Sequence, residues 1–196
     1  MSTEKLDNLC LEQFRDPNYP FLYWVEDSLI EVVLKETKRR YGLEIGFGYE
    51  LTRVFLIDPN IDWILTEPLK DRFINAKDNL EIAWGGQITS NVGGKIFAVN
   101  CLTTKKMVSE AKIILARNPH PSFFYKTEGL IPNIESLNTG QRLVIVENQG
   151  GESGVVASKE DLGKLGYHPS LFIKIEPILA HVFDRQDEEC VFDFTK

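Results

Sequence analysis

The sequence lacks any long apolar run, which bears on where the protein resides. No stretch approaches the roughly 18 consecutive apolar residues that indicate a membrane span. The first residues, MSTEKLDNLC, contain no basic segment followed by an apolar one, so we expect no secretory signal peptide. The sequence therefore predicts a protein that resides in the cytoplasm and does not associate with a membrane.

Cysteine is scarce as well. The three cysteines, Cys10, Cys101 and Cys190, are an odd number, lie far apart and form no CxxC pair. This pattern is typical of free thiols in a reducing compartment, and it argues against a structural zinc site. We predict no metal.

An excess of basic charge is also missing. The chain carries 22 basic and 29 acidic residues, a formal net charge of −7. Such a chain lacks the electrostatic footprint of unaided nucleic-acid binding, so we expect no direct binding to duplex nucleic acid. Lys35, Lys38, Arg39 and Arg40 do cluster at the end of a predicted helix, where cations complement the helix dipole. A binding patch is the alternative interpretation of this cluster.

The chain has 196 residues, of which 43% are hydrophobic, and this suffices for a sizeable core. The segment 16–20 reads DPNYP, which is typical of a loop. An apolar face of helical period then predicts a helix over Tyr23–Arg40. We predict two parts: residues 1–40 as an N-terminal helical extension, and residues 41–196 as one domain.

From residue 41 onwards, short apolar strands alternate with helices. The predicted strands are Tyr41–Ile45, Trp63–Thr66, Lys95–Asn100, Lys112–Ala116, Arg142–Glu147, Leu171–Ile175 and Cys190–Phe194. The predicted helices are Glu50–Leu56, Leu69–Leu80, Thr103–Glu110, Phe123–Leu137 and Ser158–Leu165. Several strands are apolar throughout, as in a parallel sheet that helices cover on both faces. The pattern predicts an α/β fold: a doubly wound, mostly parallel sheet with helices on both faces.

The end of the chain departs from this alternation. No helix is predicted between Leu171–Ile175, Ala180–Asp184 and Cys190–Phe194, and the link at 184–189 is polar and of hairpin length. An antiparallel C-terminal edge strand is therefore expected to close the sheet.

Two glycines stand directly behind the first strand of this predicted domain, where residues 43–50 read LEIGFGYE. In an open α/β sheet, ligands bind beyond the carboxyl ends of the strands. Gly46 and Gly48 would let a ligand approach the backbone, and a following helix would offer its free N–H groups. An ordinary turn is the alternative.

A carboxylate supports the ligand interpretation. Glu67 ends the second of these strands, nineteen residues after Gly48, where an acid can accept both ribose hydroxyls of an adenosine. The alternative is a solvated glutamate before Pro68 at the start of a helix. The dinucleotide fingerprint needs glycine or alanine where Leu51 stands, and no Walker A loop is present. These departures argue against NAD and against a P-loop site.

Taken in sequence order over residues 41–196, the motifs resemble those of the Rossmann-like (class I) S-adenosylmethionine-dependent methyltransferases. Glu44 to Gly48 looks like their first motif, and Glu67 matches the acid that holds the ribose. Asn100 and Cys101 are similar to the segment that reads the adenine edge. The resemblance implies a methyltransferase-like Rossmann fold with S-adenosylmethionine as cofactor. The cofactor-binding residues that it implies are Glu44, Gly46, Phe47, Gly48, Tyr49, Glu67, Pro68, Asn100, Cys101 and Arg117.

One position departs from the first motif. Where the family commonly has its third glycine, this chain has Glu50. Its carboxylate could repel the methionine carboxylate of the cofactor, or it could point away at the start of the helix, where an acid favours the dipole.

A second motif follows the strand Lys112–Ala116. Asn118, Pro119, His120 and Pro121 resemble the Asn-Pro-Pro-aromatic motif of methyltransferases that act on nitrogen, in which the asparagine and a proline carbonyl hold the target amine. The resemblance implies these four as substrate residues, with Asn118 and His120 as catalytic candidates. An unperturbed histidine pKa of roughly 6.5 suits a base near neutral pH. The alternative is a loop stiffened by its two prolines.

We therefore predict an S-adenosylmethionine-dependent methyltransferase that acts on a nitrogen or oxygen of a small molecule, a protein or RNA. The acidic charge favours a small-molecule or protein substrate, since RNA would need a partner that supplies basic surface. The alternative is a non-catalytic methyltransferase-fold protein with a binding or scaffolding role. The methyl acceptor is left open, as is the possibility of an oligomer.

Overall fold

The computed structural model describes residues 10–38, 40–49, 51, 54, 58–80, 93–117, 141–148, 167–175 and 178–185. From residue 147 onwards it describes the backbone only. The chain divides into two compact units, Met1–Thr103 and Thr104–Lys196, and each is treated by itself. The domain boundary expected after residue 40 stays a prediction. Within the described residues, no helix is both long enough and apolar enough to cross a membrane.

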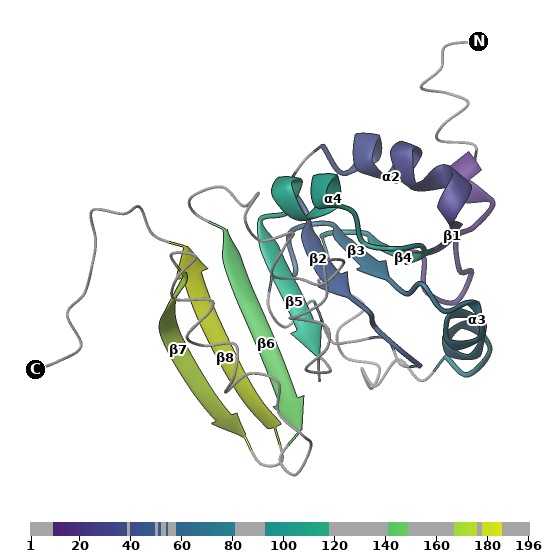
Figure 1. Cartoon of the computed structure of the whole chain (residues 1–196). Coiled ribbons are helices and arrows are strands. Elements are labelled where there is room, and N and C mark those ends of the chain that lie inside the picture. Colours follow the sequence, from purple (N-terminus) through teal and green to yellow (C-terminus); the bar gives the residue numbers. More distant parts are fainter. Residues whose placement is uncertain are drawn as a thin grey trace, which may run out of the picture. The chain divides into compact units, whose positions relative to one another are not determined.

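The first unit is built on a parallel sheet. Strands β2 (Gly42–Ile45), β3 (Trp63–Thr66) and β4 (Ile96–Asn100) form where the sequence predicts them. Together with β1 (Leu22–Glu26) they stand in the order β1-β4-β3-β2, and every pairing is parallel (Figure 1). All residues of β2 and β3 are buried, as expected of strands covered on both faces. The carboxyl ends of all four strands therefore lie at one edge.

Strand β1 corrects the prediction for the N-terminal region. The sequence predicts a helix from Tyr23, whereas Leu22–Glu26 pairs with β4 along its whole length. The first four residues of β1 are all buried, and a short apolar run with both faces covered is stable as a strand. Helix α2 spans only Ile30–Glu36, after the 3-10 turn Asp27–Leu29. The first part of the predicted helix is therefore wrong.

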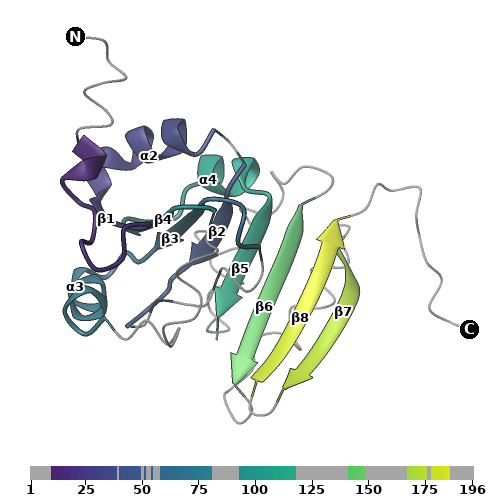
Figure 2. The ribbon, with the colours of Figure 1, turned by 180° about the vertical axis from the view of Figure 1, so that it is seen from behind.

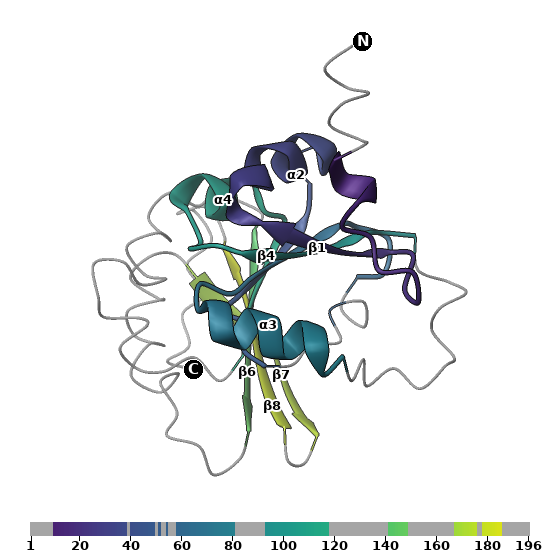
Figure 3. The same cartoon turned by 90° about the vertical axis from the view of Figure 1, so that its right-hand side faces the viewer.

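Helices cover both faces of this sheet, as predicted. Figure 3 shows α2 on one face and α3 (Lys70–Asp78) on the other. Phe73 of α3 packs edge-on against Trp24, with ring centroids 5.5 Å apart. Tyr23 points to the opposite face, where it stacks on Phe97 of the neighbouring strand. The core therefore has two layers, one on each side of the sheet.

The described residues of the second unit include helix α4 (Lys105–Glu110) and the strands β5 (Ile113–Arg117), β6 (Arg142–Asn148), β7 (Tyr167–Ile175) and β8 (Ile178–Arg185). Their order is β5-β6-β8-β7. β5 and β6 are parallel, whereas β8 runs antiparallel to both of its neighbours (Figure 2). Gln141, just before β6, donates from its buried amide to the Val108 and Ala111 carbonyl oxygens at the end of α4.

The C-terminal part confirms some predicted elements and leaves others open. The strand expected at Leu171–Ile175 exists and is longer than predicted, and the segment Ala180–Asp184, for which no helix is predicted, lies within strand β8. The edge strand expected at Cys190–Phe194 lies outside the described residues, so an antiparallel edge of that form stays a prediction. Three predicted helices also lie wholly or mostly outside the described residues: Glu50–Leu56, Phe123–Leu137 and Ser158–Leu165.

Candidate functional site

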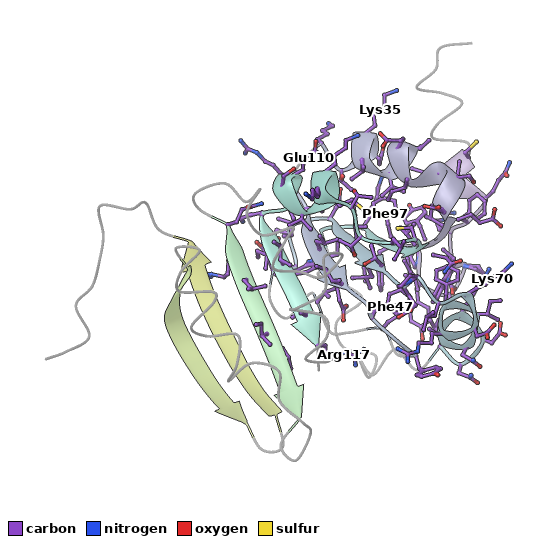
Figure 4. All side chains as sticks on the ribbon, viewed as in Figure 1. Lys35, Phe47, Lys70, Phe97, Glu110 and Arg117 are labelled. Carbon is purple, nitrogen blue, oxygen red and sulfur yellow. The ribbon has the colours of Figure 1, made fainter. Side chains whose placement is uncertain are left out.

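The glycine turn after β2 adopts a backbone that favours glycine. Gly46 has φ +66° and Gly48 has φ +76°, both in the left-handed region. Among the described residues, no atom lies within 4 Å of a Cβ built on either glycine. Phe47, between them, is buried and packs against Phe73 of α3 at 6.3 Å between ring centroids (Figure 4). The turn thus anchors one side chain in the core, and no other described residue crowds its two glycines.

Glu67 lies at the end of β3 and touches this turn directly. Its Oε2 accepts a hydrogen bond from the Gly48 backbone N–H at 2.8 Å, and its Oε1 accepts one from the Leu69 N–H at 2.9 Å. The residue is only 2% exposed, so Glu67 is not solvated, whereas its bond to the Leu69 N–H agrees with the expected place at the start of a helix. A carboxylate offers about four lone pairs, so each oxygen can accept one further hydrogen bond.

These bonds fasten the turn to the neighbouring strand. Besides the Glu67 contact, the Phe47 N–H donates to the Thr66 carbonyl oxygen at 3.1 Å. The sequence predicts that Gly48 and Glu67 meet around a ligand, and the structure shows that they also contact each other. The spacing of 19 residues therefore has a structural cause, and the role of this pair in binding a ligand stays a prediction.

Two threonines that the sequence analysis missed connect the strand ends further. The buried Thr66 hydroxyl bonds to the Glu44 carbonyl oxygen at 3.1 Å and to the Thr103 hydroxyl at 2.7 Å. The end of β3 is thereby joined to β2 on one side and to the segment after β4 on the other. The only available signal was a hydroxyl residue at the end of the otherwise apolar strand Trp63–Thr66.

Asn100, the last residue of β4, lies at the same edge of the sheet. Its side-chain Nδ2 donates to the Glu67 carbonyl oxygen at 2.7 Å. Only the amide nitrogen can donate to a carbonyl, so this bond fixes the orientation of the amide and leaves Oδ1 as an acceptor. Asn100 therefore keeps Oδ1 as an acceptor and the second N–H of its amide as a donor.

Cys101, the next residue, has a covered thiol. Burial, with a smaller contribution from the charge of Asp27, raises the pKa of Cys101 to about 12. The thiol is therefore protonated at neutral pH, whereas nucleophilic attack by cysteine requires the thiolate. The Cys101 backbone N–H donates to the Val99 carbonyl oxygen at 3.0 Å. Cys101 shapes the end of β4 and is not a reactive group.

Large apolar side chains are exposed at the same edge. Tyr49, Leu69 and Leu102 follow β2, β3 and β4, and their exposed fractions are 58%, 52% and 70%. The Arg72 guanidinium lies over the Tyr49 ring, 5.3 Å from its centroid. Apolar surface gathered at one edge is typical of a binding surface. The sequence analysis did not assign a role to Leu69 or Leu102, because exposure is decided only by the fold.

The remaining predicted residues lie in different places. Glu44 is fully buried within β2, and Pro68 is exposed after Glu67. Arg117 ends β5 in the second unit and is labelled in Figure 4. Glu50 and the segment 118–121 lie outside the described residues. Among the residues that the structure does describe, no three or more His, Cys, Asp or Glu side chains are grouped as a metal site.

No family model matches the chain, and no curated protein matches it. Solved structures with a partial likeness include a methyltransferase from Pyrococcus furiosus, with 22% identity over 80% of this chain and 81% of that one, at a TM-score of 0.49. A ribosomal protein L11 methylase from Lactobacillus delbrueckii has 12% identity over 75% and 70% of the two chains, at a TM-score of 0.47. An RNA methyltransferase from Salinibacter ruber, in complex with S-adenosyl-L-homocysteine, has 15% identity over 87% and 97%, at a TM-score of 0.44. None of these likenesses decides what this chain does.

Proposed function

We propose that the protein is an S-adenosylmethionine-dependent methyltransferase. The observation that carries the proposal is the arrangement at the carboxyl edge of the first sheet. There a left-handed glycine turn, whose glycines no other described residue crowds, is held against the acid that ends the next strand. In open α/β sheets, this edge is where nucleoside ligands bind.

The residues present suit such a ligand. Gly46 and Gly48 have no side chain that would separate a ligand from their backbone, and no described residue lies within 4 Å of a Cβ at either position. Glu67 retains one acceptor position on each oxygen for the two ribose hydroxyls. Leu69 and Leu102 offer apolar contacts to the faces of a base. When bound, S-adenosylmethionine would supply an electrophilic methyl group on its sulfonium.

The methyl acceptor in this proposal is a nitrogen or oxygen of a small molecule, a protein or RNA. Asn118 would hold an amine through its side chain, and His120 would remove a proton where the acceptor must lose one. The acidic charge favours a small-molecule or protein acceptor over duplex nucleic acid, and the protein would act in the cytoplasm.

A second candidate function is a non-catalytic binding or scaffolding role. The observation that favours it is the burial of Glu67, whose carboxylate accepts hydrogen bonds from two backbone N–H groups of the protein itself. Glu50, which stands in place of the third glycine of the resembled motif, also favours the non-catalytic role.

Calorimetry with S-adenosylhomocysteine tests the proposed function. We expect the ligand to raise the melting temperature, by a free energy of about 2.7 kcal/mol at 100 times its Kd, whereas NAD should not. Absence of binding at millimolar ligand would remove the cofactor from the proposal. Binding without transfer of a labelled methyl group to any acceptor in a cell extract would favour the non-catalytic role.

A further inference from the structure

The segment before β1 runs back along the outer edge of this strand. β1 stands first in the strand order, and β4 is its only partner among the described strands. On its other side, the Trp24 N–H donates to the Phe14 carbonyl oxygen at 2.9 Å. The Asp16 N–H donates to the Leu22 carbonyl oxygen at 2.8 Å. We call residues 10–16, drawn in purple beside β1 in Figure 3, the strap.

The strap is anchored in the core by one apolar side chain. Leu11 is only 4% exposed, whereas the two residues after it are exposed. The Phe14 N–H donates to the Leu11 carbonyl oxygen at 3.1 Å, so the anchor is joined to the residue that accepts from β1. An antiparallel bridge pairs the next residue, Arg15, with Tyr23. A buried leucine and backbone hydrogen bonds therefore hold the strap on the strand.

Without the strap, β1 would be an exposed edge strand. Such an edge offers its unpaired N–H and C=O groups to another strand, and the residues Leu22–Val25 are apolar and buried. A second copy of the chain carries the same strand, and a two-fold axis would place the two strands antiparallel. The strap already pairs with β1 in this antiparallel sense. The edge is therefore suited to pairing with its own copy.

We propose that the strap keeps the protein monomeric, and that its release lets β1 pair antiparallel with β1 of a second copy. The strap and the second copy would compete for the same backbone groups of Leu22 and Trp24. This inference goes beyond the proposed function and does not depend on it, because it needs no ligand.

The experiment compares the full-length wild type with Leu11→Asp and Gln13→Asp. Leu11→Asp places a charge where the buried leucine holds the strap, and Gln13→Asp, the matched control, adds the same charge at an exposed position of the strap. Burial of one leucine side chain shifts an equilibrium by at least about tenfold. At low protein concentration, we therefore expect the Trp24 amide hydrogen to exchange with deuterium at least about tenfold faster in Leu11→Asp than in Gln13→Asp.

Analytical ultracentrifugation over a range of protein concentrations measures association. We expect the wild type and Gln13→Asp to be monomers, and Leu11→Asp to form a dimer as its concentration rises. In that dimer the Trp24 amide should again exchange slowly, because the strand of the second copy would accept its hydrogen bond. Asp16→Pro leaves Leu11 in place but removes the strap N–H that bonds to Leu22, and it should give the same dimer.

If Leu11→Asp does not fold, the same measurements on Asp16→Pro decide the question. A variant whose Trp24 amide exchanges fast and which stays monomeric at every concentration would show that the strap does not prevent association. A dimer in which this amide still exchanges fast would be formed through another surface. An amide that exchanges at the wild-type rate in both variants would show that the strap does not protect this edge. Each of these three results overturns the inference.

Discussion

At the scale of the residue, Glu67 has a structural task whether or not a ligand is present. Its two oxygens accept N–H groups from the glycine turn and from the start of α3, and almost none of the residue is exposed. The sequence alone predicts that removing the Glu67 carboxylate changes the stability of the free protein little, because an acid near a helix start contributes only about 0.3–1 kcal/mol. The observed contacts imply a larger effect.

Glu67→Gln should therefore destabilise the free protein. An amide offers one oxygen where the carboxylate offers two, so either Gly48 or Leu69 would face an N–H group instead of an acceptor. We expect a loss of about 1.5–3 kcal/mol in the free energy of unfolding, measured by urea denaturation. Glu12→Gln, at an exposed position, is the control and should be nearly neutral. Equal stability of the two variants would mean that the two bonds contribute nothing.

Cys101 should make the stability depend on alkaline pH. Burial raises the pKa of its thiol from 9.0 to about 12 in the folded protein. Between these values the unfolded chain has lost a proton that the folded chain keeps, so the stabilisation is complete below pH 9 and declines as pH rises. We expect the stability difference between wild type and Cys101→Ala to shrink from pH 8.5 to 11, by up to about 1.4 kcal/mol per pH unit. A difference that does not change with pH would contradict this assignment.

At the scale of the element, the glycine turn depends on its backbone conformation. Gly48→Ala should destabilise the protein by about 1–2 kcal/mol, because alanine is disfavoured in the left-handed region. Gly93→Ala is a matched control: its Cβ would make only ordinary contacts, 3.7 Å from the nearest atom. Urea denaturation measures both changes. S-adenosylhomocysteine affinity should fall for Gly48→Ala and hold for Gly93→Ala. The opposite order would show that the turn is not what binds the ligand.

At the same scale, β1 is a segment whose sequence pattern predicts a helix and which forms a strand of the sheet. Its apolar residues, together with those of the following turn and helix, fit a helical period in the sequence. As a strand, however, Leu22–Val25 is buried throughout and pairs with β4 along its edge. Periodicity alone cannot assign a short apolar run to a helix or a strand. Here the edge of β4 offers backbone groups for pairing, and this pairing makes the run a strand.

At the scale of the whole molecule, the question is whether substrate positioning can be separated from cofactor binding. If Asn118 holds an acceptor amine, Asn118→Ala should lower turnover by about a hundredfold, because lost positioning costs about that much. The affinity for S-adenosylhomocysteine should not change, since the asparagine would touch the acceptor and not the adenosine. Methyl transfer assays and calorimetry measure the two quantities. Full turnover in Asn118→Ala would indicate that residues 118–121 are a proline-stiffened loop.

The sequence by itself determined most strands, the helices at α3 and α4, and the glycine turn with its acid. Apolar period and left-handed glycines are local properties, so Trp63–Thr66 and Gly46 could be recognised without any neighbour. Only the tertiary structure decided that Leu22–Glu26 is a strand, that Glu67 is buried against Gly48, and that Leu69 and Leu102 are exposed. These features depend on which segments far apart in the chain become neighbours, and local patterning does not contain that information.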